Sequence, residues 1–246
     1  MPKAVLRFYN ELNDLLPEHR RNTEFEAEFK DKRSIKDMIE ALGVPHTEID
    51  IIIVNEDSVD FSYILQEGDR IRLYPASAEP DIKDTIHLRP APVYNTRFIA
   101  DTNLGNIARY MRVLGFDTYF DPALSTRAII ELSLRENRII ITKSRRLLKF
   151  KNVTYGLLLR PGTSEAQVKT ILGCLGIKNS VKPFSRCLLC NGILISVPKN
   201  RIEDRIPPKT RSFCNEYSHC ESCDKIYWEG THVFEMKKVI NRLLEN

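Results

Sequence analysis

Two pairs of closely spaced cysteines near the end of the chain limit its possible folds more than any other feature. Cys187 and Cys190 are separated by two residues, and Cys220 and Cys223 repeat that spacing. Each pair can direct two sulfur atoms at one tetrahedral ion from a tight turn, and two such pairs complete a four-thiolate zinc site. The pattern predicts a zinc ribbon with a structural zinc ion. Because ribbons usually present a surface to nucleic acid or protein, we expect any catalysis to reside elsewhere.

A disulfide framework is the alternative interpretation of the six cysteines. A chain of 246 residues can build a hydrophobic core without disulfides, and its start, MPKAVLRFYN, has no apolar signal-peptide segment. We therefore favour metal binding in a reducing cytoplasm. No apolar run approaches the ~18 residues of a membrane span. Cys214 and His219 are rival zinc ligands, whereas Cys174 lies in an apolar run and is expected to be buried.

Charge divides the chain into segments of opposite sign. Residues 1–96 carry 12 Lys/Arg and 19 Asp/Glu, a net charge of −7. Residues 97–180 carry 14 against 6, a net of +8, and residues 181–246 carry 11 against 8, a net of +3. A polyanion partner requires a basic surface of this kind, although many basic proteins bind no polyanion. The charge pattern alone therefore leaves nucleic acid as an open option.

The first segment has the pattern of a compact α/β domain. Ser34 suits the N-cap of a helix, and Gly43 suits its end. The order of two strands, one helix and further strands is that of a β-grasp fold, which we assign to residues 1–76. The periodicity of apolar residues predicts strands over 4–9, 23–29, 49–55 and 69–74 and a helix over 35–42.

Three phrases of this segment are SIKDMIEALGVPH from Ser34, VN from Val54 and GDRIRLYP from Gly68. They resemble the ubiquitin-like sulfur carriers of thiamine and molybdopterin synthesis. Those carriers act through a free C-terminal Gly-Gly tail, whereas this chain continues as PASAEP without the two glycines. The resemblance therefore implies a ubiquitin-like domain for docking or scaffolding, with a protein partner. Residues 77–96 are predicted to be a linker, with one short strand over 85–88.

The segment 97–180 alternates strands with helices, which predicts a parallel sheet. An apolar strand leads directly into Asp101, and we expect Asp101, Asp117 and Asp121 to follow different strands. Because sites form at the carboxyl edge of open α/β sheets, the three carboxylates could meet at one rim. The expected elements are strands over 97–101, 116–121, 138–142 and 153–159 and helices over 104–114, 126–136 and 164–175.

Clustered carboxylates suit Mg²⁺ or Mn²⁺, ions that can activate water and stabilise charge on a phosphodiester. Asp101, Asp117 and Asp121 are therefore candidate catalytic residues, with Asp101 as the first candidate ligand of a catalytic ion. Each aspartate could instead cap a turn or a helix, and this alternative is stronger for Asp117 and Asp121. Glu131 could support the cluster from the following helix.

The run FIADTNLGNIARYMRVLGFD begins at Phe98, RCLLCNG begins at Arg186, and CESCDKIYWEGTH begins at Cys220. Together they resemble the Mut-seven C-terminal RNase family, which joins a PIN-like nuclease domain to a zinc ribbon, often after a ubiquitin-like domain. The resemblance covers essentially the whole chain in the right order. It implies a nuclease domain over 97–180, a ribbon with a C-terminal helix over 181–246, and metal-dependent cleavage of RNA.

One departure from the family concerns the turn after the third strand. The family usually has Thr-Arg-Asp there, and its aspartate joins the acidic cluster. This chain has Thr142, Lys143 and Ser144 instead. A hydroxyl brings no negative charge, and divalent binding depends on ligand charge and number. The first hypothesis is thus a metal-dependent endoribonuclease, weakened by Ser144, and the alternative is a module that binds RNA or ribonucleoprotein without cutting it.

Basic side chains near the expected rim could contact RNA phosphates. They could equally be solvated or complement helix dipoles, worth ~0.3–1 kcal/mol each. Tyr227 and Trp228 could stack on a base, although covering a thin ribbon core is the more common role for such residues. The RNA-binding candidates are Arg109 and Arg112 on the first helix of this segment and Lys143, Arg145 and Arg146 on the turn after the third strand.

Overall fold

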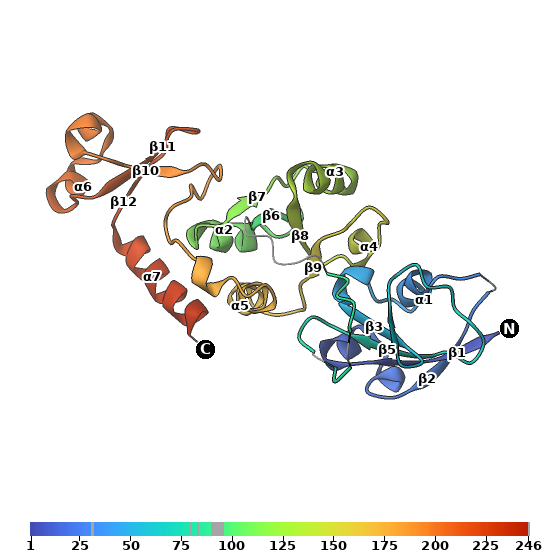
Figure 1. Cartoon of the computed structure of the whole chain (residues 1–246). Coiled ribbons are helices and arrows are strands. Elements are labelled where there is room, and N and C mark those ends of the chain that lie inside the picture. Colours follow the sequence, from blue (N-terminus) through green and yellow to red (C-terminus); the bar gives the residue numbers. More distant parts are fainter. Residues whose placement is uncertain (31, 79, 83, 90–95, 246) are drawn as a thin grey trace. The chain divides into compact units, whose positions relative to one another are not determined.

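Figure 1 shows the computed structural model of the chain. The structure describes residues 1–30, 32–78, 80–82, 84–89 and 96–245. It divides into two compact units, of which the first comprises residues 1–94 and 126–158 and the second residues 95–125 and 159–246. The domain boundaries given above stay predictions. Of the predicted linker over 77–96, residues 79, 83 and 90–95 lie outside the described part of the chain.

The first unit opens with a five-stranded sheet in the order β2-β1-β5-β3-β4. β1 and β5 are parallel, and the other neighbours are antiparallel, which confirms the β-grasp order. Alternate residues of β1 are buried because one face of the sheet packs on the core. The strands are β1 (Lys3–Phe8), β2 (Phe25–Glu28), β3 (Ile51–Val54), β4 (Asp57–Val59) and β5 (Arg70–Tyr74).

One helix, α1 (Ile35–Ala41), accompanies this sheet. As predicted, Ser34 caps it, with its hydroxyl accepting a hydrogen bond from the Asp37 N–H at 3.1 Å. Short 3₁₀ helices fill the connections, namely η1 (Asn10–Leu15), η2 (Glu18–Arg20) and η3 (His46–Glu48).

The chain after the sheet folds back onto Asp50, the residue directly before β3. Residues 85–88 do not form the predicted strand. Instead, the N–H groups of Leu88 and Arg89 donate to the main-chain carbonyl and carboxylate of Asp50, at 2.7 and 3.0 Å. His87 Nδ1 lies 2.7 Å from the same carboxylate. Asp50 is buried, so its hydrogen bonds hold this segment in an irregular conformation instead of a sheet ladder.

The first unit also contains α3 (Thr126–Glu136), β8 (Arg138–Thr142), α4 (Arg145–Leu148) and β9 (Gly156–Leu158). β8 is buried throughout and pairs in parallel with β9. The predicted basic turn after β8 contains a one-turn helix, α4, because Ser144 caps it by accepting from the Leu147 N–H at 3.3 Å. Four residues are too few to show the apolar periodicity of a helix, so the sequence does not predict α4.

The second unit contains β6 (Arg97–Ala100), α2 (Gly105–Val113), β7 (Asp117–Tyr119) and α5 (Ser164–Cys174). β6 and β7 are parallel, and α2 buries Ile107, Ala108 and Met111, in agreement with the predicted α/β pattern. The expected burial of Cys174 is wrong. This residue ends α5 on its exposed side, because Ile171 and Leu172 fill the core.

The remainder of the second unit is a three-stranded antiparallel sheet in the order β10-β11-β12, followed by a long helix. The helix contacts α5, where Arg242 pairs with Glu165 at 2.9 Å. No helix within the described ranges is both long and apolar enough to cross a membrane. The elements are η4 (Lys178–Ser180), β10 (Leu194–Val197), η5 (Lys199–Arg201), η6 (Glu203–Arg205), α6 (Pro208–Phe213), β11 (Tyr217–Cys220), β12 (Ile226–Trp228) and α7 (Thr231–Leu244).

Candidate functional site

Asp101 stands where β6 ends and the turn into α2 begins. The Thr102 N–H donates to its carboxylate at 2.7 Å, and the Leu104 N–H donates to its main-chain carbonyl at 2.8 Å. These bonds fix the turn and leave the side chain half-buried. The predicted position at the carboxyl end of a parallel strand is therefore the observed one.

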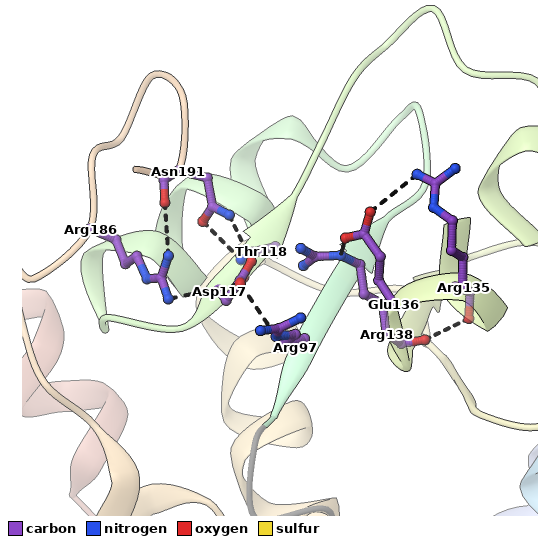
Figure 2. Close-up of polar contacts among 9 residues, drawn as sticks. Arg97, Asp117, Thr118, Arg135, Glu136, Arg138, Arg186 and Asn191 are labelled. Atoms are coloured by element: carbon purple, nitrogen blue, oxygen red, sulfur yellow. Dashed lines mark hydrogen bonds and ion pairs between the residues drawn. The ribbon is translucent and has the colours of Figure 1, made fainter. Parts of the chain in front are cut away.

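Asp117, the first residue of β7, contacts the segment around the first cysteine pair. The Asn191 side-chain amide donates to its carboxylate at 2.7 Å. Arg97 and Arg186 each place a guanidinium nitrogen 3.8 Å from the same carboxylate. Figure 2 shows these side chains turned toward Asp117, which is only 15% exposed. Asp117 thus carries interactions between the nuclease-like strand and the ribbon.

Asn191 also binds the main chain of β7. Its side-chain oxygen accepts from the Thr118 N–H at 2.9 Å (Figure 2). The Thr118 N–H is not used in the parallel pairing of β7 with β6, and Asn191 provides its acceptor. Sequence reasoning missed Asn191 and Arg186 as functional side chains. The available signal was their position immediately beside Cys187 and Cys190.

Arg112 is buried at 5% exposure and does not present its guanidinium to solvent. Its Nε donates to the Thr118 carbonyl at 2.9 Å, and its Nη1 donates to the carbonyls of Leu188 and Leu189 at 3.0 Å each. Burial lowers the pKa of Arg112, while the negative charge of the neighbouring Cys187 thiolate acts in the opposite direction. This geometry suits a structural link to the ribbon and leaves little surface for a phosphate.

Asp121 follows β7 and caps a turn, accepting from the Ala123 N–H at 2.9 Å. Glu131 forms an exposed ion pair with Arg127 one helical turn earlier, at 2.7 Å. Within the described residues, the acidic side chains form no group of three with oxygen atoms close enough to share one ion. The expected three-carboxylate rim is therefore not assembled in this structure.

The four predicted zinc ligands do come together. The sulfur atoms of Cys187, Cys190, Cys220 and Cys223 all lie within 4.8 Å of one another. Cys187 and Cys223 are 3.5 Å apart, and Cys190 and Cys220 are 3.4 Å apart. A tetrahedral ion with Zn–S bonds of ~2.3 Å would separate its sulfurs by ~3.8 Å, so the donor set and its spacing fit zinc.

Both cysteine pairs use the same turn. The N–H groups of Asn191 and Asp224 donate to the carbonyls of Cys187 and Cys220, at 2.9 and 2.7 Å. Both turn residues have positive φ, at 70° and 61°, a conformation that Asn and Asp tolerate better than most residues. A Cβ on Gly192 would lie only 2.9 Å from the Cys220 sulfur, so this position requires glycine.

Tyr227 supports the ligand set from β12. Its hydroxyl oxygen lies 3.1 Å from the Cys187 sulfur and accepts from the Leu188 N–H at 3.2 Å. Burial raises the pKa of Cys187, but the hydrogen bonds from Tyr227 and from nearby N–H groups outweigh it and bring that pKa to about 6. Cys187 therefore favours the thiolate that a zinc ion needs, whereas burial raises the pKa of Cys190 and brings that of Cys223 to about 12. Trp228 packs against the ribbon core.

The two rival ligands lie outside the cysteine cluster. Cys214 is buried in an apolar cluster with Ile206 and Ile226 and directs its thiol to the Glu229 carbonyl at 3.1 Å. His219 Nε2 lies 2.7 Å from the Asp224 carboxylate. The four-cysteine assignment consequently needs neither residue.

The remaining basic candidates differ in their surroundings. Arg109 is exposed on α2, in the second unit. Lys143, Arg145 and Arg146 are exposed at and after the end of β8, in the first unit. Arg145 is already engaged, because its Nη1 donates to the Leu15 carbonyl at 2.8 Å.

Comparison with known families gives two matches. The model of the Mut7-C RNAse domain matches residues 96–240, and the model of the Mut7-C ubiquitin domain matches residues 1–81. Neither the curated proteins nor the solved structures gave a match to the chain.

Proposed function

The chain belongs to the family of the Mut7-C RNAse domain, and we propose that it is a metal-dependent endoribonuclease that hydrolyses RNA phosphodiesters. The observation that carries the proposal is the place of Asp101 at the carboxyl end of β6, within the matched region. That edge is where α/β folds assemble their sites, and a carboxylate there is a suitable ligand for a hard cation.

In this proposal Asp101 and Asp121 hold Mg²⁺ or Mn²⁺. The lack of a three-carboxylate group is compatible with this role, because Mg²⁺ is often bound by one or two carboxylates together with substrate phosphates. The ion would supply an activated water and charge stabilisation at the phosphodiester. We assign Asp117 a positioning role, since Asn191, Arg97 and Arg186 already surround its carboxylate.

Exposed cations would hold the RNA backbone. Arg109, Lys143 and Arg146 are exposed and suit phosphate contacts. The buried Arg112 is assigned to the ribbon contact instead. The zinc site would be structural, because its four thiolates leave no open position for a substrate.

Ser144 favours a second function, which is RNA binding without cleavage. Ser144 stands where the family usually has an acid, and its hydroxyl caps α4 without adding charge. A domain with one carboxylate fewer could bind RNA and fail to cut it. Cleavage and binding therefore have to be measured on the same protein.

The test is incubation of labelled RNA with Mn²⁺ and either the zinc-loaded wild type or Asp101→Asn. We expect Asp101→Asn to lower the cleavage rate by at least about a hundredfold, the usual loss when one group that stabilises a transition state is removed. Its RNA affinity should stay close to that of the wild type. Cleavage that is equal in both proteins would refute the role of Asp101, and binding without any cleavage would favour the second function.

A further inference from the structure

The ubiquitin-like domain contacts the segment that follows β8 within the first unit. His46 Nδ1 lies 2.7 Å from the Glu40 carboxylate, and its Nε2 lies 2.8 Å from the Val153 carbonyl. Both partners are acceptors, so each ring nitrogen lies at hydrogen-bond distance from an acceptor. The side chain is only 8% exposed. His46 is therefore an interior part of this contact.

Glu48 adds a second contact from the same 3₁₀ helix, η3. Its carboxylate accepts from the Leu158 N–H of β9 at 3.1 Å. Glu48 is 7% exposed. A buried carboxylate requires such partners, because an unpaired one would be strongly destabilising. The contact between η3 and β9 is thus a specific one.

Two basic side chains complete the contact from the other side. Arg145 donates to the Leu15 carbonyl at 2.8 Å, and Lys149 donates to the Glu40 carbonyl at 2.6 Å. Glu40 lies in the last turn of α1, where helix carbonyls lack internal partners and favour a cation. A Cβ built on Gly43 would lie 3.8 Å from the Arg145 guanidinium, so this side chain lies directly beside the end of α1.

The two basic side chains in these contacts, Arg145 and Lys149, belong to a strongly basic segment. Residues 143–151 contain Lys143, Arg145, Arg146, Lys149 and Lys151 and no acidic residue. Arg145 and Lys149 are bonded to the ubiquitin-like domain, and residues 1–96 carry a net charge of −7. An acidic domain placed on a basic segment opposes the approach of another polyanion.

We propose that the ubiquitin-like domain is an internal competitor of RNA for the basic segment 143–151. The docked domain engages Arg145 and Lys149 through main-chain carbonyls and so competes with phosphates for them, and RNA binding to this segment displaces it. This inference rests on the proposed RNA-directed function. It gives the ubiquitin-like domain, whose end has no Gly-Gly tail, a binding partner within its own chain.

The test compares two double variants of the full chain. His46→Ala with Glu48→Ala removes the contacts to Val153 and Leu158. Glu18→Ala with His19→Ala makes the same chemical changes at exposed positions of the same domain. Docking is read from the acetylation rate of Lys149, with the exposed Lys151 as internal reference. RNA affinity is read from the anisotropy of a short labelled single-stranded RNA.

We expect the first variant to acetylate Lys149 faster and to bind RNA several-fold more tightly. Two additional phosphate contacts should steepen the slope of log affinity against log salt by about 1.4, which is twice the ~0.7 per contact of single strands. The second variant should match the wild type. Equal acetylation of Lys149 in all three proteins, or faster acetylation with unchanged RNA affinity, would overturn the proposal.

A measurement on the wild type guards against misfolding of the variant. Saturating RNA should accelerate hydrogen exchange at the Leu158 amide, because displacement of the domain removes Glu48. Unchanged exchange with RNA bound would overturn competition. A further outcome is that none of the three proteins binds RNA, while the acetylation rate of Lys149 still differs between the docked and the undocked variant. In that case the proposed function fails, and the domain contact is only structural.

Discussion

Asn191 connects the zinc ribbon to the nuclease domain through one side chain. Its amide reaches both the Thr118 N–H and the Asp117 carboxylate, while its positive φ shapes the cysteine turn. Arg112 makes the reciprocal connection from α2 to the carbonyls of Leu188 and Leu189. Two residues thus make the ribbon part of the same packed unit as β7.

Asn191→Gly tests this connection, because glycine keeps the positive φ and removes the amide. The Thr118 N–H and the Asp117 carboxylate would each lose a partner, which should cost ~1–3 kcal/mol in the free energy of unfolding. Urea denaturation of the zinc-loaded protein measures it. Asp224→Gly is the matched control, because Asp224 has a φ of 61° and an exposed side chain whose ion pair with Arg205 contributes little to stability. Equal losses in both variants would contradict the special role of Asn191.

The first cysteine turn and β7 are joined by hydrogen bonds and pack together. The turn offers Asn191 to β7 on one side and its carbonyls to Arg112 on the other. Zinc bound by the four cysteines, as proposed, would hold that turn, so the ion is expected to stabilise β7 as well as the ribbon. The long helix α7 packs against α5 within the second unit.

Removal of zinc should therefore loosen β7 but leave the β-grasp sheet intact. We expect a chelator to raise hydrogen exchange at the Thr118 amide, whose acceptor is Asn191, and to leave exchange at the β3 amides unchanged. Hydrogen exchange followed by mass spectrometry measures both regions in one sample. Unchanged protection of Thr118 after complete zinc loss would show that β7 does not depend on the ion.

Local elements were largely predictable, because their signals lie within short windows of sequence. The helix cap at Ser34, the apolar stripe of α2 and the cysteine spacing each act over a few residues. Contacts between distant residues were not predictable in this way. Asn191 and Thr118 are 73 positions apart, and the burial of Arg112 depends on the ribbon that covers it.

At the scale of the whole molecule, three functional parts share one chain. A ubiquitin-like domain contacts a basic segment, a nuclease domain presents Asp101 at a strand end, and a four-cysteine site holds the ribbon. Zinc is assigned to structure and a harder ion to catalysis. We propose that metal-dependent cleavage of RNA persists in this chain, although Ser144 stands where the family usually has a carboxylate.

The most direct test is the rate of RNA cleavage at limiting Mn²⁺ in wild type, Ser144→Asp and Ser144→Asn. Asp and Asn cap a helix about equally well, so the two variants differ in charge and not in the support of α4. We predict measurable cleavage by the wild type and about a tenfold gain in Ser144→Asp alone, because an added carboxylate tightens divalent binding. No cleavage by the wild type, or the same rate in both variants, would refute metal-dependent cleavage at this site.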